Sequence, residues 1–202
     1  MTEPIKLSED HIDMLAEIFN MGMGKSLNAI SSLSGKEFEI TFKLPNVNLL
    51  QRDEFLKKIK VESRFGLVLQ GYSGQLEGKA FMYYPETSGK QLVKLLLGTD
   101  IPVEEVERLE SDALIEIGNI FINSSISCLA NFLETEIQTE IPQIIFQDKL
   151  DHSLLKENEY VIHLDAPFQI AHHDIEGVVG FILDNQSTKA LLKAIDIYME
   201  EG

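Results

Sequence analysis

The sequence predicts an α+β fold of layered helices and sheet, in which a helix–strand–strand–strand–helix unit occurs twice. One observation is that apolar residues alternate along the chain between helical and strand spacing. A second is an internal repeat at an offset of 99 residues. The matches are Asp13 with Asp112, Leu15 with Leu114, Glu17 with Glu116, Ile18 with Ile117, Asn20 with Asn119 and, further along, Glu77 with Glu176 and Gly78 with Gly177. We therefore expect one domain over residues 1–202, made of two repeats at about 8–100 and 103–200.

The first repeat is expected to begin with a long helix from about Ser8 to Leu33. A Ser-Glu-Asp start signal there precedes apolar residues at helical intervals. The stretches EFEITFKLP, VESRFGLVLQG and GQLEGKAFMYYP have strand character. A shorter helix is predicted from about Glu86 to Leu97, before Gly98. The charged segment NLLQRDEFLKKIK fits either a short helix or a loop.

The second repeat is expected to follow the same order. Its predicted elements are a helix from about Val103 to Glu134, strands near Glu136–Phe146, Tyr160–Ile170 and Ile175–Leu183, and a helix from Ser187. Three strands alone would bury a sheet poorly, so we expect the repeats to share one antiparallel sheet of about six strands. The two long helices are predicted to lie on one side of this sheet, related by a pseudo-two-fold axis.

Composition and charge restrict the class of protein. The formal charge of −16 disfavours nucleic acid and anionic lipid, and favours a partner that presents cations. The N-terminal MTEPIKLSEDH carries acids where a signal peptide needs a basic stretch. No apolar run approaches the ~18 residues of a membrane span, and the single cysteine, Cys128, cannot form an internal disulfide. We expect a cytoplasmic protein without membrane insertion.

A Gly-Lys-Ser sequence at residues 24–26 has the ending of a phosphate-binding P-loop. A P-loop also requires a glycine where this chain has Phe19, and it follows a buried strand. Here a helical pattern precedes it, so the nucleotide-site interpretation is rejected. Gly22 and Gly24 are instead expected to be points where the long helix packs closely on a neighbour, or a local bend.

The long helices are each predicted to expose one ridge of two acids and an amide. At ~100° per residue, Asp13, Glu17 and Asn20 point in one direction. Leu15, Ile18 and Phe19 then lie on the opposite, core-facing side. In the second repeat the corresponding ridge consists of Asp112, Glu116 and Asn119, with Leu114, Ile117 and Phe121 behind it. Taken alone, such a ridge is usually only a solvated helix face.

Two other groups of residues contain side chains of the types found in metal or catalytic sites. His172, His173 and Asp174 suggest a metal site, but neighbouring strand residues point to opposite faces and further ligands are not evident, so a polar hairpin turn is preferred and no metal is predicted. Ser124, Ser125 and Ser127 have no histidine at a spacing that would activate a nucleophile.

The ridge residues resemble the motif of the CheC, CheX and FliY family of chemotaxis phosphatases. That motif is Asp or Ser, three residues, Glu, two residues, Asn, twenty-two residues and Pro. The second repeat matches it through Pro142, whereas in the first repeat Pro45 comes two residues late. Two motif copies and the length of the chain make two-site CheC the nearest member, since CheX would have one motif.

The resemblance implies a hydrolase that removes the phosphoryl group from the aspartate of a CheY-type response regulator in two-component signalling. Asn20 and Asn119 would position the attacking water, and Glu17 and Glu116 would pair with a lysine of the regulator. Asp13 and Asp112 would assist docking. The resemblance implies no cofactor for this chain, and Mg²⁺ bound in the partner regulator. The alternative function is a non-catalytic adaptor for a phosphorylated regulator, a CheD-type deamidase, or both. Because its motif is complete, the second site is expected to be the faster.

Overall fold

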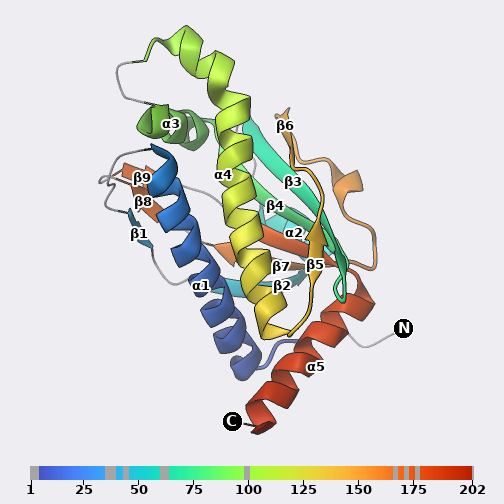
Figure 1. Cartoon of the computed structure of the whole chain (residues 1–202). Helices are drawn as coiled ribbons and strands as arrows, with labels where there is room; N and C mark the ends of the chain where they lie inside the picture. The colour runs from blue at the N-terminus through green and yellow to red at the C-terminus, as the bar shows by residue number, and fades with distance from the viewer. Residues whose placement is uncertain are drawn as a thin grey trace.

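The computed structural model describes residues 5–34, 40–42, 46–59, 64–97, 101–165, 168–170, 173–175 and 178–201. In this part of the chain the helices are α1 (Glu9–Ser34), α2 (Arg52–Lys58), α3 (Glu86–Leu97), α4 (Val103–Phe132), the 3₁₀ turn η1 (His152–Leu154) and α5 (Asn185–Glu201). The strands are β1 (Ile40–Phe42), β2 (Asn46–Gln51), β3 (Phe65–Gly74), β4 (Gly78–Pro85), β5 (Ile137–Thr139), β6 (Gln143–Gln147), β7 (Tyr160–Asp165), β8 (Phe168–Ile170), β9 (His173–Ile175) and β10 (Val178–Leu183). Figure 1 shows their arrangement.

The first long helix begins where the sequence predicts. The Ser8 hydroxyl accepts a hydrogen bond from the His11 backbone N–H at 3.2 Å, and the Ser8 N–H donates to His11 Nδ1 at 3.1 Å. This reciprocal pair satisfies two backbone donors at the start of α1. The other ring nitrogen of His11 lies 2.9 Å from a carboxylate oxygen of Asp196, so the same residue also ties α1 to α5.

The main sheet has seven strands, all paired antiparallel, in the order β2-β7-β10-β4-β3-β5, with β6 also pairing with β3. A second, three-stranded sheet has the order β1-β8-β9. The antiparallel α+β prediction is confirmed, although the chain forms more strands than the six or so expected. The stretch Glu136–Phe146 is divided into β5 and β6 at Pro142, whose ring removes a backbone donor. The stretch Tyr160–Ile170 is divided because β7 and β8 belong to different sheets. The undecided charged segment forms the end of β2 followed by α2.

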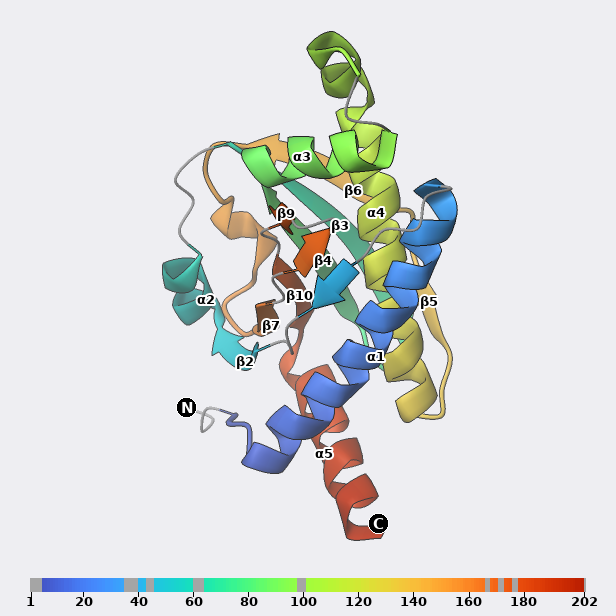
Figure 2. The same cartoon turned by 90° about the vertical axis from the view of Figure 1, so that its left-hand side faces the viewer.

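Both faces of the main sheet are covered, but unequally. Alternate residues of β4 point to opposite faces: Ala80, Met82 and Tyr84 join the large core beneath the long helices, whereas Phe81 joins a smaller cluster with Phe55 of α2. Helices α1, α3, α4 and α5 all contribute to the large core. Figures 1 and 2 show α1 and α4 side by side across this face, as the sequence predicts.

Helix α4 is the centre of the helical layer. Among the described residues it is the one helix whose length and average composition would allow it to cross a membrane, although no uninterrupted apolar run of that length was expected. More than half of the apolar stretch of α4 is buried inside the protein. Its buried residues include Cys128, which has the expected role of a small apolar side chain and is unpaired. The apolar character of α4 therefore follows from its central position in the core.

Small residues let α1 and α4 approach closely. A Cβ atom placed on Gly22 would lie 2.8 Å from Ser125 Cα and 3.2 Å from the Ser124 carbonyl oxygen. Ser26 and Ser125 are buried at this contact, and each donates its hydroxyl to the carbonyl four residues back in its own helix. The packing role predicted for Gly22 is confirmed. Gly24 has no such role, since its Cβ would meet no atom within 4 Å.

The order of strands interleaves the two halves of the chain. The first strand of the main sheet from the first half, β2, pairs with β7 of the second half, and β6 of the second half pairs with β3 of the first. At the centre of the sheet β4 pairs with β10, and there Phe81 lies opposite Gly180, the residue 99 positions later. If a two-fold axis relates the repeats and passes between β4 and β10, equivalent residues of the two repeats must lie opposite each other, as Phe81 and Gly180 do. The duplication itself stays a prediction from the sequence.

The helix crossing can be tested by replacing each glycine with alanine. Gly22→Ala should lower the free energy of unfolding by roughly 1–3 kcal/mol, because the new methyl group would press on the backbone of α4. Gly24→Ala is the matched control, and should raise it by up to ~1 kcal/mol, because alanine favours helix and this site is open. Chemical denaturation of both variants measures the difference. Equal free energies of unfolding for the two variants would show that the helix crossing can accommodate a methyl group at position 22.

Candidate functional site

The two predicted ridges lie on the outer faces of α1 and α4. Asp13, Glu17 and Asn20 are exposed, whereas the three residues predicted to lie behind them, Leu15, Ile18 and Phe19, are buried. On α4, Asp112 and Glu116 are exposed and Asn119 is half-buried, with Leu114, Ile117 and Phe121 buried behind them. The helical-wheel prediction is confirmed for α1, and on α4 it is confirmed for the two acids and the core-facing residues, whereas Asn119 is half-buried and not fully exposed.

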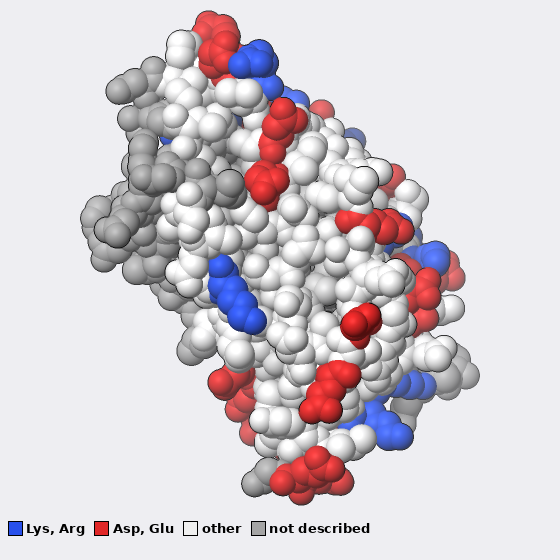
Figure 3. Space-filling model, viewed as in Figure 1, with Lys and Arg blue, Asp and Glu red and all other residues white. Residues whose placement is uncertain are grey.

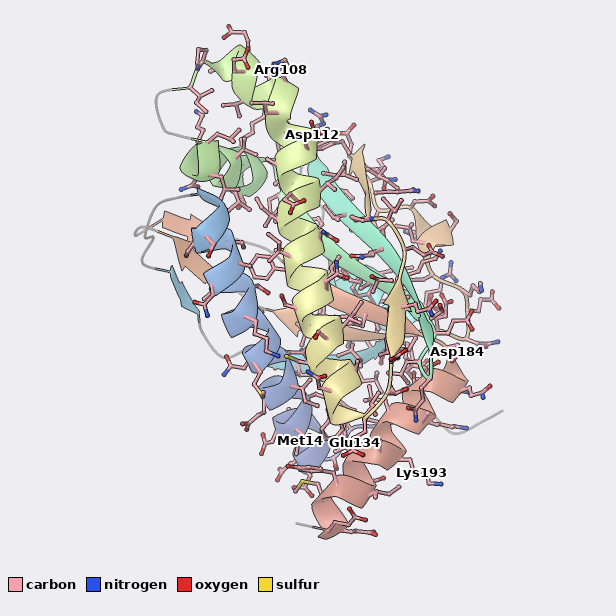
Figure 4. All side chains as sticks on the ribbon, in the orientation of Figure 1. Met14, Arg108, Asp112, Glu134, Asp184 and Lys193 are labelled. Atoms are coloured by element: carbon pink, nitrogen blue, oxygen red, sulfur yellow. The ribbon has the colours of Figure 1, made fainter. Side chains whose placement is uncertain are left out.

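The ridges lie toward opposite ends of the helix pair. Helices α1 and α4 run antiparallel (Figure 1), and each ridge lies within the first two-thirds of its helix. Figure 4 labels Asp112 near one end of this pair and Met14, beside the first ridge, near the other. If Gly22 and Ser125 are level at the crossing, Asn20 and Asn119 are offset by about 12 Å along the helix axes, at 1.5 Å per residue. The two ridges are thus separate surfaces.

The ridge carboxylates are free to meet a partner. In the described part of the chain, Asp13, Glu17 and Glu116 make no ion pair or hydrogen bond through their side chains. Figure 3, viewed onto α1 and α4, shows acidic side chains at intervals along this face, with mostly uncharged surface and a basic side chain between them. Such a face favours a partner with a cation at the matching position.

Asn119 is held by a chain of side-chain hydrogen bonds that the sequence analysis did not find. Asn123, one turn further along α4, donates from Nδ2 to Asn119 Oδ1 at 2.5 Å. Gln70 of β3 donates from Nε2 to Asn123 Oδ1 at 3.1 Å, and also to the backbone carbonyl of Glu140 at 2.9 Å. Glu140 lies two residues before Pro142, the last residue of the second motif. A clue in the sequence was that the residue four positions after each motif asparagine differs, Gly24 in one copy and Asn123 in the other.

Asn20 has a different environment. Its side chain makes no hydrogen bond to any residue that the structure describes. Beside the first ridge lies a groove of about 500 Å³ between α1, α4 and α5, lined by Met14, Glu17, Met21, Phe132 and Tyr198 among others. Met21 and Tyr198 are more than half exposed. The first ridge therefore combines an unrestrained amide with an adjacent, partly apolar groove.

The surroundings of the second ridge also contain a buried acid and a groove. Glu110, two residues before Asp112, is buried, and burial raises the pKa of its carboxyl group above its ordinary value, although Lys90 and Arg64 oppose the change. A groove of about 340 Å³ between α4 and β5 has Asn123 in its lining.

Other residues from the sequence analysis do not join these ridges. Ser125 is buried with its hydroxyl bonded to the Phe121 carbonyl, so it is not available as a nucleophile. Pro45, His172 and the side chains of His173 and Asp174 lie outside the part of the chain that the structure describes. Among the described residues no group of three or more His, Cys, Asp or Glu side chains could hold a metal ion.

The chemistry available at each ridge is limited to binding and orientation. A carboxamide can donate two hydrogen bonds and accept two, and it adds no charge. A carboxylate one helical turn away can pair with an ammonium group. No activated nucleophile was found in the described ridges, so they suit a reaction in which the other reactive groups come from a partner.

Comparison with known proteins supports this description. No family model matches the chain. Over 192 residues it is 26% identical to the CheY-P phosphatase CheC of Bacillus subtilis, an alignment that covers 93% of this chain and 87% of that protein.

Among solved structures, FliY of Thermotoga maritima matches with a TM-score of 0.72 and 17% identity, covering 95% of this chain and 98% of that one. The CheX–CheY–BeF₃–Mg²⁺ complex of Borrelia burgdorferi matches with a TM-score of 0.55 and 19% identity, covering 83% of this chain and 97% of the matched chain. The resemblance predicted from the two ridges is confirmed: the chain is similar in sequence to CheC over nearly its whole length and has the fold of the CheC, CheX and FliY proteins.

Proposed function

We propose that this chain is a phosphatase that hydrolyses the aspartyl-phosphate of a CheY-type response regulator. The observation that carries the proposal is the pair of exposed Asp–Glu–Asn ridges on α1 and α4, in a chain similar to a CheY-P phosphatase. The crystallised complex of CheX with CheY, BeF₃ and Mg²⁺ supports a partner of this class, which would bring its own Mg²⁺.

In each ridge the asparagine and the glutamate have different roles. The regulator provides the phosphoryl group, and its Mg²⁺ and lysine stabilise the charge of that group. The missing component is a water molecule held in line with phosphorus, and orientation of this kind can supply several kcal/mol. Asn20 or Asn119 positions this water without adding negative charge next to the phosphoryl group. Glu17 or Glu116 pairs with the regulator lysine one turn away, which sets the depth of the amide. Asp13 and Asp112 add longer-range attraction.

The two sites operate independently in this proposal. The ridges face outward on two different helices, with their asparagines offset by about 12 Å along the helix axes, so binding of a regulator at one ridge requires no rearrangement of the other. The groove beside Glu17 offers apolar contacts to a regulator at the first site. The second site has the complete motif and the restrained amide, and we expect it to be the faster.

The location and the alternative function follow from the same reasoning. A regulator of this class is cytoplasmic, so we place this chain in the cytoplasm. A non-catalytic adaptor would use the same ridges for binding alone and would show no phosphate release. Binding to a CheD-type deamidase stays an alternative from the sequence resemblance. Phosphate release from several phosphorylated CheY-type regulators, including CheY of Bacillus subtilis, separates catalysis from binding.

A first prediction concerns the charge of the ridges. Combining Glu17→Lys with Glu116→Lys should weaken binding to a phosphorylated CheY-type regulator at least about tenfold, because each site then presents a cation to a lysine. Binding by the wild type should also weaken as ionic strength rises. Glu200→Lys with Glu201→Lys is the control, since it makes the same change in net charge at the exposed end of α5. If both double variants bind equally well, the ridges are not the docking surface.

A second prediction separates the two amides. Replacing Asn20 or Asn119 by alanine should lower the rate at that site by roughly 100-fold or more, the scale expected for a lost positioned group. Each single variant should keep a large part of the total activity, and the double variant should approach the spontaneous decay of the regulator. Stability should change little, because neither asparagine lies in the core.

Asn28→Ala is the control. Asn28 is an exposed asparagine of α1 outside the ridge, so this variant should keep the full rate. The measurement is phosphate release from one regulator at saturating concentration. A double variant that still works at the wild-type rate would eliminate this mechanism.

A further inference from the structure

We infer that Asn123, held by Gln70, is a positioning residue that orients the catalytic amide of the second site and has no counterpart at the first. This inference rests on the proposed function of Asn119, and concerns how that side chain is oriented before a partner arrives. It assigns a role to two residues outside the Asp–Glu–Asn–Pro motif.

The hydrogen bonds define a direct path from the sheet to the motif. Asn119 and Asn123 are one turn apart on α4, the spacing at which helical side chains meet. Their side chains are joined at 2.5 Å, and Gln70 joins Asn123 at 3.1 Å. Gln70 is only 2% exposed, so its position is set by the packing around it. The outermost member of the chain, Asn119, is half-buried and remains accessible.

The donor and acceptor of each hydrogen bond between these side chains follow from the Glu140 carbonyl, at which the series ends. The backbone carbonyl of Glu140 can only accept, so Gln70 must present Nε2 to it. The same Nε2 donates to Asn123, which must therefore present Oδ1 to Gln70 and Nδ2 to Asn119. Asn119 in turn must present Oδ1 to Asn123. Rotation of any one amide by half a turn would place two acceptors or two donors against each other.

This polarity leaves Asn119 with the groups that the reaction needs. Its Nδ2 keeps both hydrogens, which can donate to a phosphoryl oxygen or to water. Its Oδ1 keeps one acceptor site, which can take a hydrogen from the attacking water. An amide that is already oriented does not have to be ordered when the partner binds, and this lowers the barrier through orientation.

The contact between α4 and β3 makes the path possible. A Cβ atom on Gly118 would lie 2.7 Å from a methyl carbon of Val68, so glycine at this position allows the helix to lie against the strand. Val68 and Gln70 are two residues apart on β3 and so face the same side, toward α4. Pro142 lies two residues after Glu140, between β5 and β6, so the motif proline is close in sequence to the carbonyl that orients Gln70.

The first site lacks this device. The residue one turn after Asn20 is Gly24, which has no side chain and faces open space. Asn20 has no side-chain hydrogen bond to the described residues, so its amide can rotate. The two sites should therefore differ in the order of their amides as well as in their rates.

The kinetic test uses variants in which only one site works. In an Asn20→Ala background, Asn123→Ala should lower kcat for release of phosphate from phosphorylated Bacillus subtilis CheY by about 10- to 100-fold, with KM unchanged. Asn123→Asp keeps the shape and the bond from Gln70 but cannot donate to Asn119, so it should lower kcat at least as much. Ser127→Ala, an exposed change one turn further along α4, is the matched control and should leave kcat unchanged. In an Asn119→Ala background, Asn123→Ala should not alter the remaining rate of the first site, which excludes general damage to the fold.

A second measurement uses the free protein. The ¹⁵N relaxation of side-chain amides should show Asn119 more ordered than Asn20 on the picosecond-to-nanosecond timescale, and Asn123→Ala should remove the difference.

The outcomes separate the inference from the proposed function. If the Asn20→Ala, Asn119→Ala double variant loses activity but Asn123→Ala leaves kcat of the second site unchanged, Asn123 is not a positioning residue. Equal mobility of the two amides in the wild type would overturn the inference as well. A double variant that keeps the full rate would refute the proposed function, and the role of Asn123 in catalysis with it.

Discussion

The close crossing of α1 and α4 is the constraint on which both ridges depend. Gly22 brings the helices together so tightly that a single methyl group would meet the backbone of the partner helix. Gly118 allows a similarly close contact between α4 and β3, where a methyl group would meet the side chain of Val68. Because α4 is fixed on both sides, its remaining free face is narrow, and that face carries Glu116 and Asn119. On α1 the same crossing leaves Glu17 and Asn20 outward. The two surfaces thus follow from how the small residues are placed.

The two ridges are alike in sequence but differ in their degree of order. Immobilising a side chain on binding costs about 0.5–1.5 kcal/mol. At the second ridge part of this cost is already met during folding, through the bonds from Gln70 and Asn123. The first ridge has an unrestrained amide but lies beside the larger groove, which includes Met14 and Tyr198. One ridge is therefore better suited to orientation, and the other offers more apolar surface for contact.

The sequence predicted the features that depend on local pattern. The bounds of α1, α3 and α4 agree with the structure within about two residues, the usual uncertainty of helix ends, because capping signals and apolar spacing act within a few turns. The exposure of Asn20 and the burial of Phe19 follow from the same periodicity. The number of strands was less predictable, since the division of Tyr160–Ile170 depends on which strands each part pairs with. The bond between Asn123 and Gln70 could not be predicted, because it joins residues 53 positions apart on different elements.

The interleaving of strands has a consequence for synthesis. Strands β3 and β4 pair with each other first and gain β6 and β10 at their outer edges later, whereas in the described part of the chain β1 and β2 find their partners, β8 and β7, only in the second half. During translation at about 5–20 residues per second, those strands would wait roughly 5–20 s for the rest of the chain. Throughout that interval Phe65, Val68 and Met82, all buried in the finished protein, would lie in an incomplete sheet with open edges. The chain therefore depends on its second half to protect the first from aggregation, and a ribosome that stalls between the halves would release a fragment that cannot complete its sheet.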